Sequence, residues 1–310
     1  MSTAPETPTF AEFDQTVIKP QTPMQRFASD FMESKLAVIG LLTFLVILCL
    51  ALLAPFISPQ NPYDLMQLDI MNGKLAPGEQ DMMGDITFWL GTDDQGRDLL
   101  SGIFFGLRIS LFVGAMSAFL ALFLGGGVGL FAAYMGGKWD TFLMRLVDLQ
   151  LSFPAILIAL VLLAVLGQGV DKIIIALVVT QWAYFARTIR SSALVERGKE
   201  YIEAAHCLAL SRNRVMFTHL LPNCLPPLIV VVTMRVAYAI ALEATLSFLG
   251  MGLPVTEPSL GLLISNGFEY MLSGRYWISF FPGLALLVTI VSINLVGDHL
   301  RDILNPRLQK

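Results

Sequence analysis

Charge is the scarcest property of this sequence, and its scarcity excludes most classes of soluble protein. Only 14% of the 310 residues are charged, 55% are hydrophobic, and the mean hydropathy is +0.68. A soluble chain of this length is not so apolar. A net charge of −4 without basic stretches between aromatics argues against a nucleic-acid partner. The three histidines and three cysteines lack metal-ligand or disulfide-framework spacing, and no catalytic constellation is present, so we expect neither a metal site nor an enzyme.

Long apolar runs occupy much of the chain. A helix crosses the hydrocarbon core of a bilayer with about 20 apolar residues. We expect Pro154 to be accommodated inside a span, and Arg187 and Arg190 to snorkel at the end of a short one. The six predicted spans are Leu36–Ile57, Ile109–Met135, Leu149–Gly167, Ile173–Ala186, Pro226–Gly250 and Tyr276–Gly297.

The basic residues predict the orientation of these spans. If the N-terminus is cytoplasmic, 14 Lys and Arg lie in inside segments and 5 in outside segments, and Arg235 within a span completes the 20. The positive-inside rule therefore places both termini in the cytoplasm. The expected division is a cytoplasmic N-terminal tail (1–35), a first span (36–57), an external segment (58–108), a five-helix membrane core (109–297) with a cytoplasmic loop (187–224), and a cytoplasmic C-terminal tail (298–310). The first 22 residues of the N-terminal tail are expected to be disordered.

The external segment is long and acidic, which indicates a small subdomain rather than a simple connection. We expect an amphipathic helix from Asp93 to Leu107. Thr92, Asp93 and Asp94 suit the N-terminus of such a helix as caps and through the helix dipole. This structural role is favoured over direct contact with a substrate.

The cytoplasmic loop is polar and rich in helix formers. Tyr201–Leu210 predicts one short helix, on which Glu203, Ala204 and Ala205 form a compact surface that a partner can approach closely. Ser211 is a candidate N-cap for a second helix through Leu221, which Pro222 closes. On these grounds alone, a docking element and a solvated loop without a partner are equally plausible.

The same residues resemble a known motif. Glu203-Ala204-Ala205, a turn at Ala209 and the pair Leu221-Pro222 are similar to the coupling loop of ABC-importer permeases. The family has Gly at the turn, where a left-handed backbone costs Ala roughly 1 kcal/mol. The resemblance implies that Tyr201–Pro222 contacts an ATPase.

Further motifs narrow the resemblance to the dipeptide/oligopeptide/nickel permeases, and specifically to the subunit with a long loop after its first span. They are Leu90–Asp98, Met144–Asp148, Leu246–Gly250, Phe281–Leu284, Asn294–Asp302 and Asn305–Arg307.

That family implies an all-α polytopic protein of the type I ABC-importer permease fold in the bacterial cytoplasmic membrane. It implies a second homologous permease subunit, two ATP-binding subunits that hold ATP and Mg, and a periplasmic solute-binding protein. No cofactor is expected in this chain. Imported solutes in the family are peptides, opines, nickel chelates and related small molecules.

Two ionisable residues lie inside the fifth predicted span, where such groups usually face a pathway or a partner. Arg235 and Glu243 are about 12 Å apart along a helix and roughly 80° around it, which disfavours a direct bond. Each therefore needs another partner. The family often has Glu at the position of Glu243, which favours a structural role there. Arg235 has no such match and is the stronger candidate for the pathway.

The glycines of the second predicted span and two pairs of charged residues are explained by helix packing and ion pairing. Gly125, Gly126, Gly127 and Gly129 predict close helix packing rather than a phosphate loop, since no Gly-Lys-Ser/Thr follows. The i, i+3 pairs Arg145/Asp148 and Asp298/Arg301 are expected to form ion pairs near cytoplasmic helix ends.

Two other classes remain open on the residues alone. An ion-gradient-driven secondary transporter would carry midplane carboxylates and inverted repeats, and neither is evident here. A membrane scaffold without transport activity is the third alternative.

Overall fold

The computed structural model describes residues 22–62, 64–81, 84–254, 256–257 and 259–304. Residues 1–21, which make up nearly all of the stretch expected to be disordered, lie outside them. The described chain is almost wholly helical. Its α-helices are α1 (Pro23–Glu33), α2 (Lys35–Ile57), α3 (Leu99–Met135), α4 (Gly137–Ser152), α5 (Ala155–Leu166), α6 (Val170–Arg197), α7 (Glu200–Cys207), α8 (Arg212–Arg214), α9 (Leu221–Phe248), α10 (Leu260–Phe268) and α11 (Trp277–Leu304). A π-helical segment, η3 (Val215–Leu220), joins α8 to α9.

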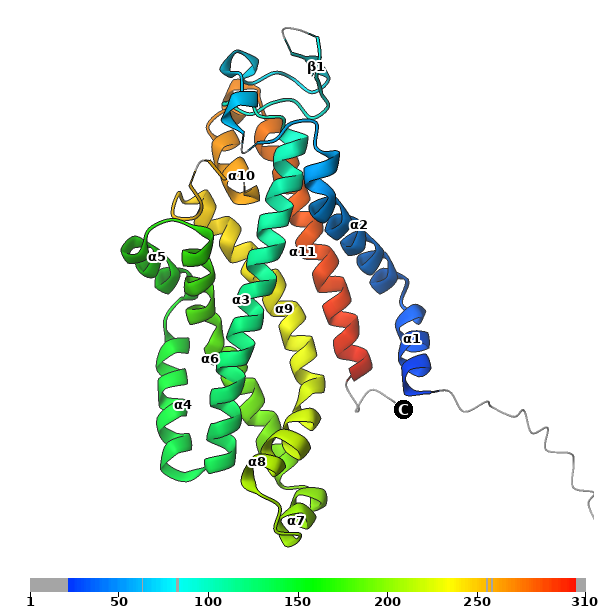
Figure 1. Ribbon diagram of the computed structural model, residues 1–310, viewed down its shortest axis with the longest axis vertical. Helices are drawn as coiled ribbons and strands as arrows, with labels where there is room; N and C mark the ends of the chain where they lie inside the picture. Colours follow the sequence, from blue (N-terminus) through cyan, green and yellow to red (C-terminus); the bar gives the residue numbers. More distant parts are fainter. Residues whose placement is uncertain (1–21, 63, 82–83, 255, 258, 305–310) are drawn as a thin grey trace, which may run out of the picture.

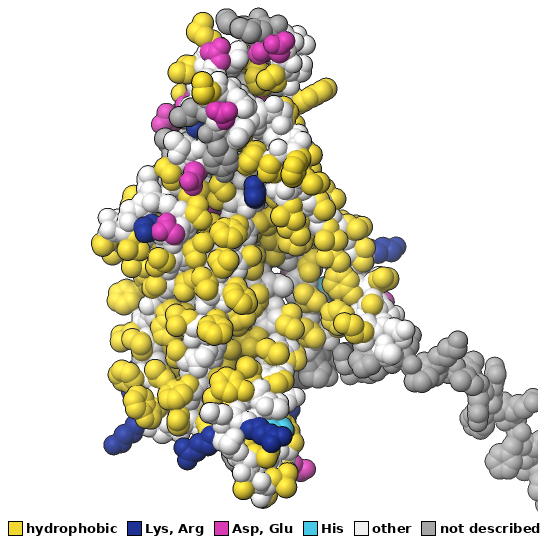
Figure 2. All heavy atoms as spheres, viewed as in Figure 1, with side chains coloured by type: hydrophobic (Ala, Val, Ile, Leu, Met, Phe, Trp, Pro, Cys, Tyr) yellow, Lys and Arg dark blue, Asp and Glu magenta, His cyan; other side chains and the backbone are white. Residues whose placement is uncertain are grey.

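The molecule is an elongated bundle in which α3, α6, α9 and α11 run along the long axis (Figure 1). In the described residues, five helices are long and apolar enough to cross a membrane, and the bent pair α4 and α5 can supply a sixth span. Figure 2 shows hydrophobic side chains over the middle of one face. Several Lys and Arg side chains lie at the end that carries α7, and most of the visible Asp and Glu side chains lie toward the opposite end.

The third predicted span is wrong as a single helix. The chain bends by 89° between α4 and α5, with Pro154 at the N-cap of α5. Proline disfavours the helical conformation in the residue before it, and Phe153 is extended here with φ −95° and ψ 141°. The break therefore follows from the proline that we expected a straight helix to accommodate.

The second predicted span begins too late. Helix α3 starts at Leu99 and continues to Met135, so no separate amphipathic helix precedes it. Its N-cap is Asp98, whose carboxylate accepts hydrogen bonds from the Ser101 N–H at 2.8 Å and the Ser101 hydroxyl at 2.6 Å. The capping role expected of Thr92, Asp93 and Asp94 belongs to Asp98.

Residues 58–98, most of the segment that we expect outside the membrane, form a small subdomain. It contains the 3₁₀ turns η1 (Leu65–Gln67) and η2 (Ile70–Asn72) and the antiparallel strands β1 (Glu79–Gln80) and β2 (Thr87–Phe88). Thr92 helps to close it, because its hydroxyl donates to the Asn72 carbonyl at 2.6 Å and accepts from the Leu75 N–H at 2.8 Å. A third 3₁₀ turn, η4 (Met271–Ser273), precedes α11.

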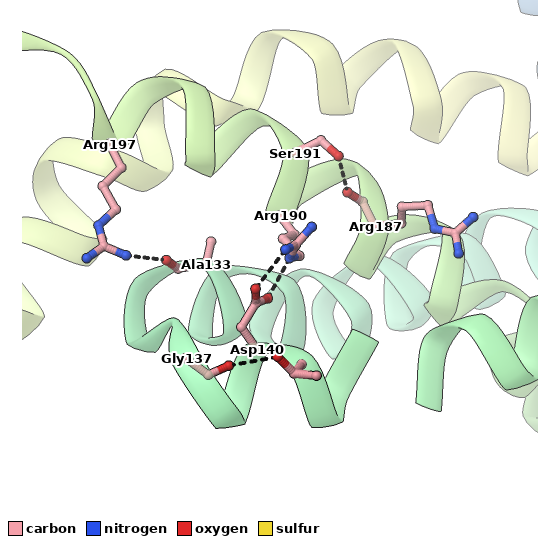
Figure 3. A network of polar contacts seen from close by, with 8 residues as sticks. Ala133, Gly137, Asp140, Arg187, Arg190, Ser191 and Arg197 are labelled. Carbon is pink, nitrogen blue, oxygen red and sulfur yellow. Dashed lines mark hydrogen bonds and ion pairs between the residues drawn. The ribbon is translucent and has the colours of Figure 1, made fainter. Parts of the chain in front are cut away.

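The fourth predicted span is also too short. Helix α6 continues without a break through Arg187 and Arg190 to Arg197. The two arginines bind acidic residues of α4 rather than extending a short span. Arg190 makes a bidentate pair with Asp140 at 2.5 and 2.7 Å (Figure 3). Arg187 pairs with Asp148, and the expected pair of Asp148 with Arg145 is not among the ion pairs of the described residues.

Glycines bring α3 and α6 into backbone contact. A Cβ on Gly125 would lie 2.0 Å from the Trp182 carbonyl oxygen, and one on Gly129 would lie 2.2 Å from that of Ala186. Gly126 is almost as tight against Ile189, whereas Gly127 has nothing within 4 Å. The predicted small-residue contact is confirmed for three of the four glycines.

Candidate functional site

A short helix projects from the end of the bundle and forms the first candidate site. Figure 1 shows α7 beyond the ends of α3 and α4. Glu203 and Ala204 are exposed on α7, and Leu208 just after it is 74% exposed. Ala205 was expected on the same surface, but it is only 4% exposed because it packs inward in a cluster with Ile202 and Val215. The outward surface therefore combines an acid, a small residue and a large apolar residue.

Tyr201 fixes this helix to the preceding one. Its hydroxyl donates to a carboxylate oxygen of Glu196 at 2.7 Å, and the same Glu196 binds Lys199 at 2.7 Å. Burial and the neighbouring Glu196 carboxylate raise the pKa of Tyr201 to about 12. Tyr201 therefore orients α7 from within, while Glu203 and Ala204 face outward.

The turn after α7 has the left-handed backbone that the family provides with Gly. Ala209 has φ +52°, one of two non-glycine residues with positive φ in the described chain. The Leu210 N–H returns to the Ala205 carbonyl at 3.2 Å, which closes the end of the helix. The turn geometry is therefore kept although the residue differs.

Pro222 does not close the second helix of the loop. Residues Arg212–Phe248 form one continuous helical segment that includes α8, η3 and α9. Pro222 stands directly after the π-helical η3 inside this continuous segment, where the Leu221 N–H bonds to the Met216 carbonyl, and the helix continues past the proline. Ser211 is the N-cap residue as expected, although its side chain makes no capping hydrogen bond. Leu221 and Pro222 thus begin the helix that returns into the bundle.

Glu243 lies fully inside the packed chain. It is 0% exposed, and its two carboxylate oxygens accept hydrogen bonds from the hydroxyls of Ser110 at 2.9 Å and Ser247 at 2.8 Å. Ser110 belongs to α3, so the carboxylate connects α3 to α9. In this conformation the geometry supports a structural role.

Arg235 has aromatic rather than acidic neighbours. Its guanidinium carbon lies 3.5 Å from the ring centroid of Tyr184 on α6 and 5.4 Å from that of Tyr238 on α9. Arg235 takes part in none of the four ion pairs in the described residues, and Glu243 is bonded elsewhere. A cation–π contact contributes about 0.5–2 kcal/mol, whereas Arg at the centre of a spanning helix costs about 2.5–3.5 kcal/mol. The two rings together therefore contribute about 1–4 kcal/mol, which is comparable with that cost.

Several residues of these sites were not predicted. Leu208 lies in a segment of helix-forming residues and does not stand out there. Its position as an apolar residue beside the predicted turn at Ala209 could have identified it as exposed. The sequence does not indicate that Tyr184 contacts Arg235, because only the packing of α6 against α9 brings the two side chains together. Tyr238, on the same helix as Arg235, was not singled out either. Ser110 was likewise an ordinary small polar residue in an apolar run.

Comparison with known proteins agrees with this architecture. Residues 125–310 match the family described as "Binding-protein-dependent transport system inner membrane component", and residues 22–77 match the "N-terminal TM domain of oligopeptide transport permease C".

Two curated relatives cover nearly the whole chain. The "Dipeptide transport system permease protein DppC" of Haemophilus influenzae is 35% identical, covering 94% of this chain and 97% of the relative. The protein of the same description from Escherichia coli K12 is 38% identical, covering 94% and 95%.

The fold also resembles a solved structure, the MetNI methionine ABC transporter in inward-facing conformations. A chain of its native CY5 crystal form has a TM-score of 0.53 and 21% identity, covering 64% of this chain and 94% of that chain. At this identity the likeness concerns the fold alone. Taken with the family matches, it shows that the chain belongs to the inner-membrane components of binding-protein-dependent transport systems, as a permease subunit of an ABC importer.

Proposed function

We propose that this permease subunit imports peptides or related small solutes across the bacterial inner membrane. This proposal is supported by the names of its relatives, several of which are described as dipeptide or di/tripeptide transport permeases and are 34–38% identical to this chain. In this proposal a homologous permease completes the pathway, and a periplasmic binding protein delivers the solute. ATP and Mg are bound by two partner ATPase subunits, and this chain itself hydrolyses nothing.

The observation that carries the coupling proposal is the outward surface of α7. Glu203, Ala204 and Leu208 are exposed on an element beyond the hydrophobic band, and Leu208 has no apolar cover in the described chain. A single exposed Leu is common on protein surfaces, so Leu208 supports docking only together with the Glu203-Ala204-Ala205 sequence that resembles the coupling loop. An ATPase that grips α7 moves both α6 and the Arg212–Phe248 segment, because α7 connects them.

The proposed orientation has both termini and α7 in the cytoplasm. The excess of Lys and Arg in the segments assigned to the inside supports it. The external subdomain at residues 58–98 then faces the periplasm, where a binding protein can reach it.

The coupling proposal is tested with Leu208→Glu in the complete transporter. A buried carboxylate at an apolar contact is costly, so we expect the ATPase subunits to copurify about tenfold less. Leu272→Glu is the matched control, because Leu272 is 102% exposed at the external end. Equal copurification for both variants would contradict docking on α7, whereas native transporter that imports no peptide would contradict only the proposed substrate.

A further inference from the structure

A cation without an acidic partner in the described residues lies on α9, against α6. Arg235 is 14 residues from the start of α9, and Tyr184 is 14 residues from the start of α6. Both residues lie within helical segments that are long and apolar enough to cross a membrane. A charge within such a segment usually marks a pathway or a partner.

The surroundings of Arg235 are open on one side. Tyr184 is 37% exposed and Tyr238 is 39% exposed, although both rings contact the guanidinium. The exposed parts of these two rings are thus not covered by the described chain.

The guanidinium has its aromatic contacts but lacks an anion. The side chain of Arg235 shares a hydrogen bond with that of Tyr184, and a guanidinium stacked on a ring keeps its other in-plane N–H donors available to a further partner. Those donors match a carboxylate in a bidentate pair. Within the described chain, the one acid inside α9 is Glu243, and Ser110 and Ser247 already bond it.

We propose that Arg235, held by Tyr184 and Tyr238, binds the C-terminal carboxylate of a peptide in transit. This inference rests on the proposed function, because it identifies the part of the substrate that the pathway recognises. Every linear peptide has this carboxylate whatever its side chains, so one arginine can serve many sequences. The two aromatic rings add apolar contact for the adjoining residue of the peptide.

The test uses the complete transporter in proteoliposomes with its binding protein. Uptake of dialanine is compared among the native protein, Arg235→Gln, Arg235→Lys and the neighbouring control Met234→Gln. We expect Arg235→Gln to reduce uptake about tenfold or more, Arg235→Lys to keep a substantial part, and Met234→Gln to resemble the native protein.

A second arm uses dialanine amide, which lacks the carboxylate charge. For each ligand, the uptake by a variant is divided by the uptake by the native protein. Differences in how the unchanged binding protein recognises the two ligands then do not affect the comparison. We expect Arg235→Gln to reduce uptake of the acid and to leave uptake of the amide at its native rate. Equal losses for both ligands overturn the proposal, as does unchanged uptake of dialanine by Arg235→Gln.

The main rival is a carboxylate of the homologous permease as the partner of Arg235. Copurification of all subunits with the Arg235→Gln variant is expected under our proposal, and loss of assembly overturns it in favour of the rival. A native transporter that imports no dialanine contradicts the proposed function instead, so the two failures are distinguishable.

Discussion

Ala209 holds a backbone conformation that L-residues other than Asn and Asp rarely adopt. A left-handed conformation costs Ala about 1–2 kcal/mol, and Gly avoids that cost while losing more chain entropy on folding. We expect Ala209→Gly to stabilise the end of α7 by roughly 0.5–1 kcal/mol. Slower hydrogen exchange of the α7 amides in the purified transporter would measure the gain.

The control is the same substitution one turn earlier. Ala204 is exposed and helical, so Ala204→Gly is expected to destabilise α7 by about 0.8–1 kcal/mol. Faster exchange in both glycine variants would mean that the left-handed turn at Ala209 carries no cost.

Asp93 is expected to make the subdomain at residues 58–98 sensitive to pH. Burial raises the pKa of Asp93 to about 6, although it accepts hydrogen bonds from the Gln95 and Arg97 N–H groups, both at 2.9 Å. A folded pKa above the unfolded value of 3.8 means that folding favours the protonated acid. The associated stability is present below about pH 4 and is lost as the pH rises through about 6.

Asp93→Asn should remove much of this pH dependence, because an amide oxygen can still accept both backbone hydrogen bonds. The measurement is limited proteolysis of residues 58–98 between pH 4 and 7. The native subdomain is expected to become easier to cleave as the pH rises, and the variant less so. Burial also raises the pKa of Asp98, so a residual slope is expected. An unchanged slope would mean that Asp93 does not control it.

At the scale of helices, two ion pairs join α4 to α6 with very different burial. The side chains of Arg190 and Asp140 are 29% and 18% exposed, whereas those of Arg187 and Asp148 are 51% and 59% exposed. Charge-assisted hydrogen bonds in a partly buried pair contribute about 1.5–3 kcal/mol, and exposed pairs about 1 kcal/mol or less.

Asp140→Asn is therefore expected to lower the thermal stability of the purified protein clearly more than Asp148→Asn. The exchanged pair Asp140→Arg with Arg190→Asp should recover part of the loss. Equal effects of the two single variants would show that burial does not separate these pairs.

The α3–α6 contact offers another matched pair of variants. Gly129→Ala places a Cβ against the Ala186 carbonyl and should separate the helices, with a loss of about 1–3 kcal/mol. Gly127→Ala meets open space and should be neutral or stabilise the helix by up to about 1 kcal/mol. Thermal unfolding in detergent compares them, and similar melting temperatures would argue against close packing.

Composition and periodicity predicted that helices span the membrane, but not where every helix breaks. The reason lies in the two prolines, whose effect depends on their place within a helix. Pro154 interrupts a helix because a proline disfavours the helical conformation in the residue before it, Phe153, whereas the helical segment that contains Pro222 continues past it, directly after the π-helical η3. The sequence gives the position of each proline, but it does not indicate whether the helix bends there.

At the scale of the whole molecule, the proposed orientation can be tested with the natural cysteines. Cys207 is exposed in α7 and Cys224 is buried. A membrane-impermeant maleimide is expected to label Cys207 in inside-out vesicles but not in intact cells. A cysteine at the exposed external position, Asp85→Cys, should show the reverse. Labelling of Cys207 from outside would invert the orientation.

The sequence indicates the residues of the α7 segment but not the surroundings of Arg235. Glu203, Ala204 and Ala209 lie in one short segment, so local pattern was enough to find them. The environment of Arg235 depends on Tyr184, which is 51 positions away in the sequence and contacts it only through the packing of α6 on α9. The ion-gradient alternative is not supported, because the chain belongs to the ABC-importer permeases.

The glycine contact between α3 and α6 has a mechanical consequence. Side chains elsewhere can change rotamer to absorb a shift, but Gly125 and Gly129 oppose bare carbonyls and have nothing to rearrange. We therefore expect α3 and α6 to move together as one rigid unit. Alternation between inward and outward access would then be produced by the other helices moving against this unit. A cross-link between α3 and α6 is accordingly expected to leave transport intact.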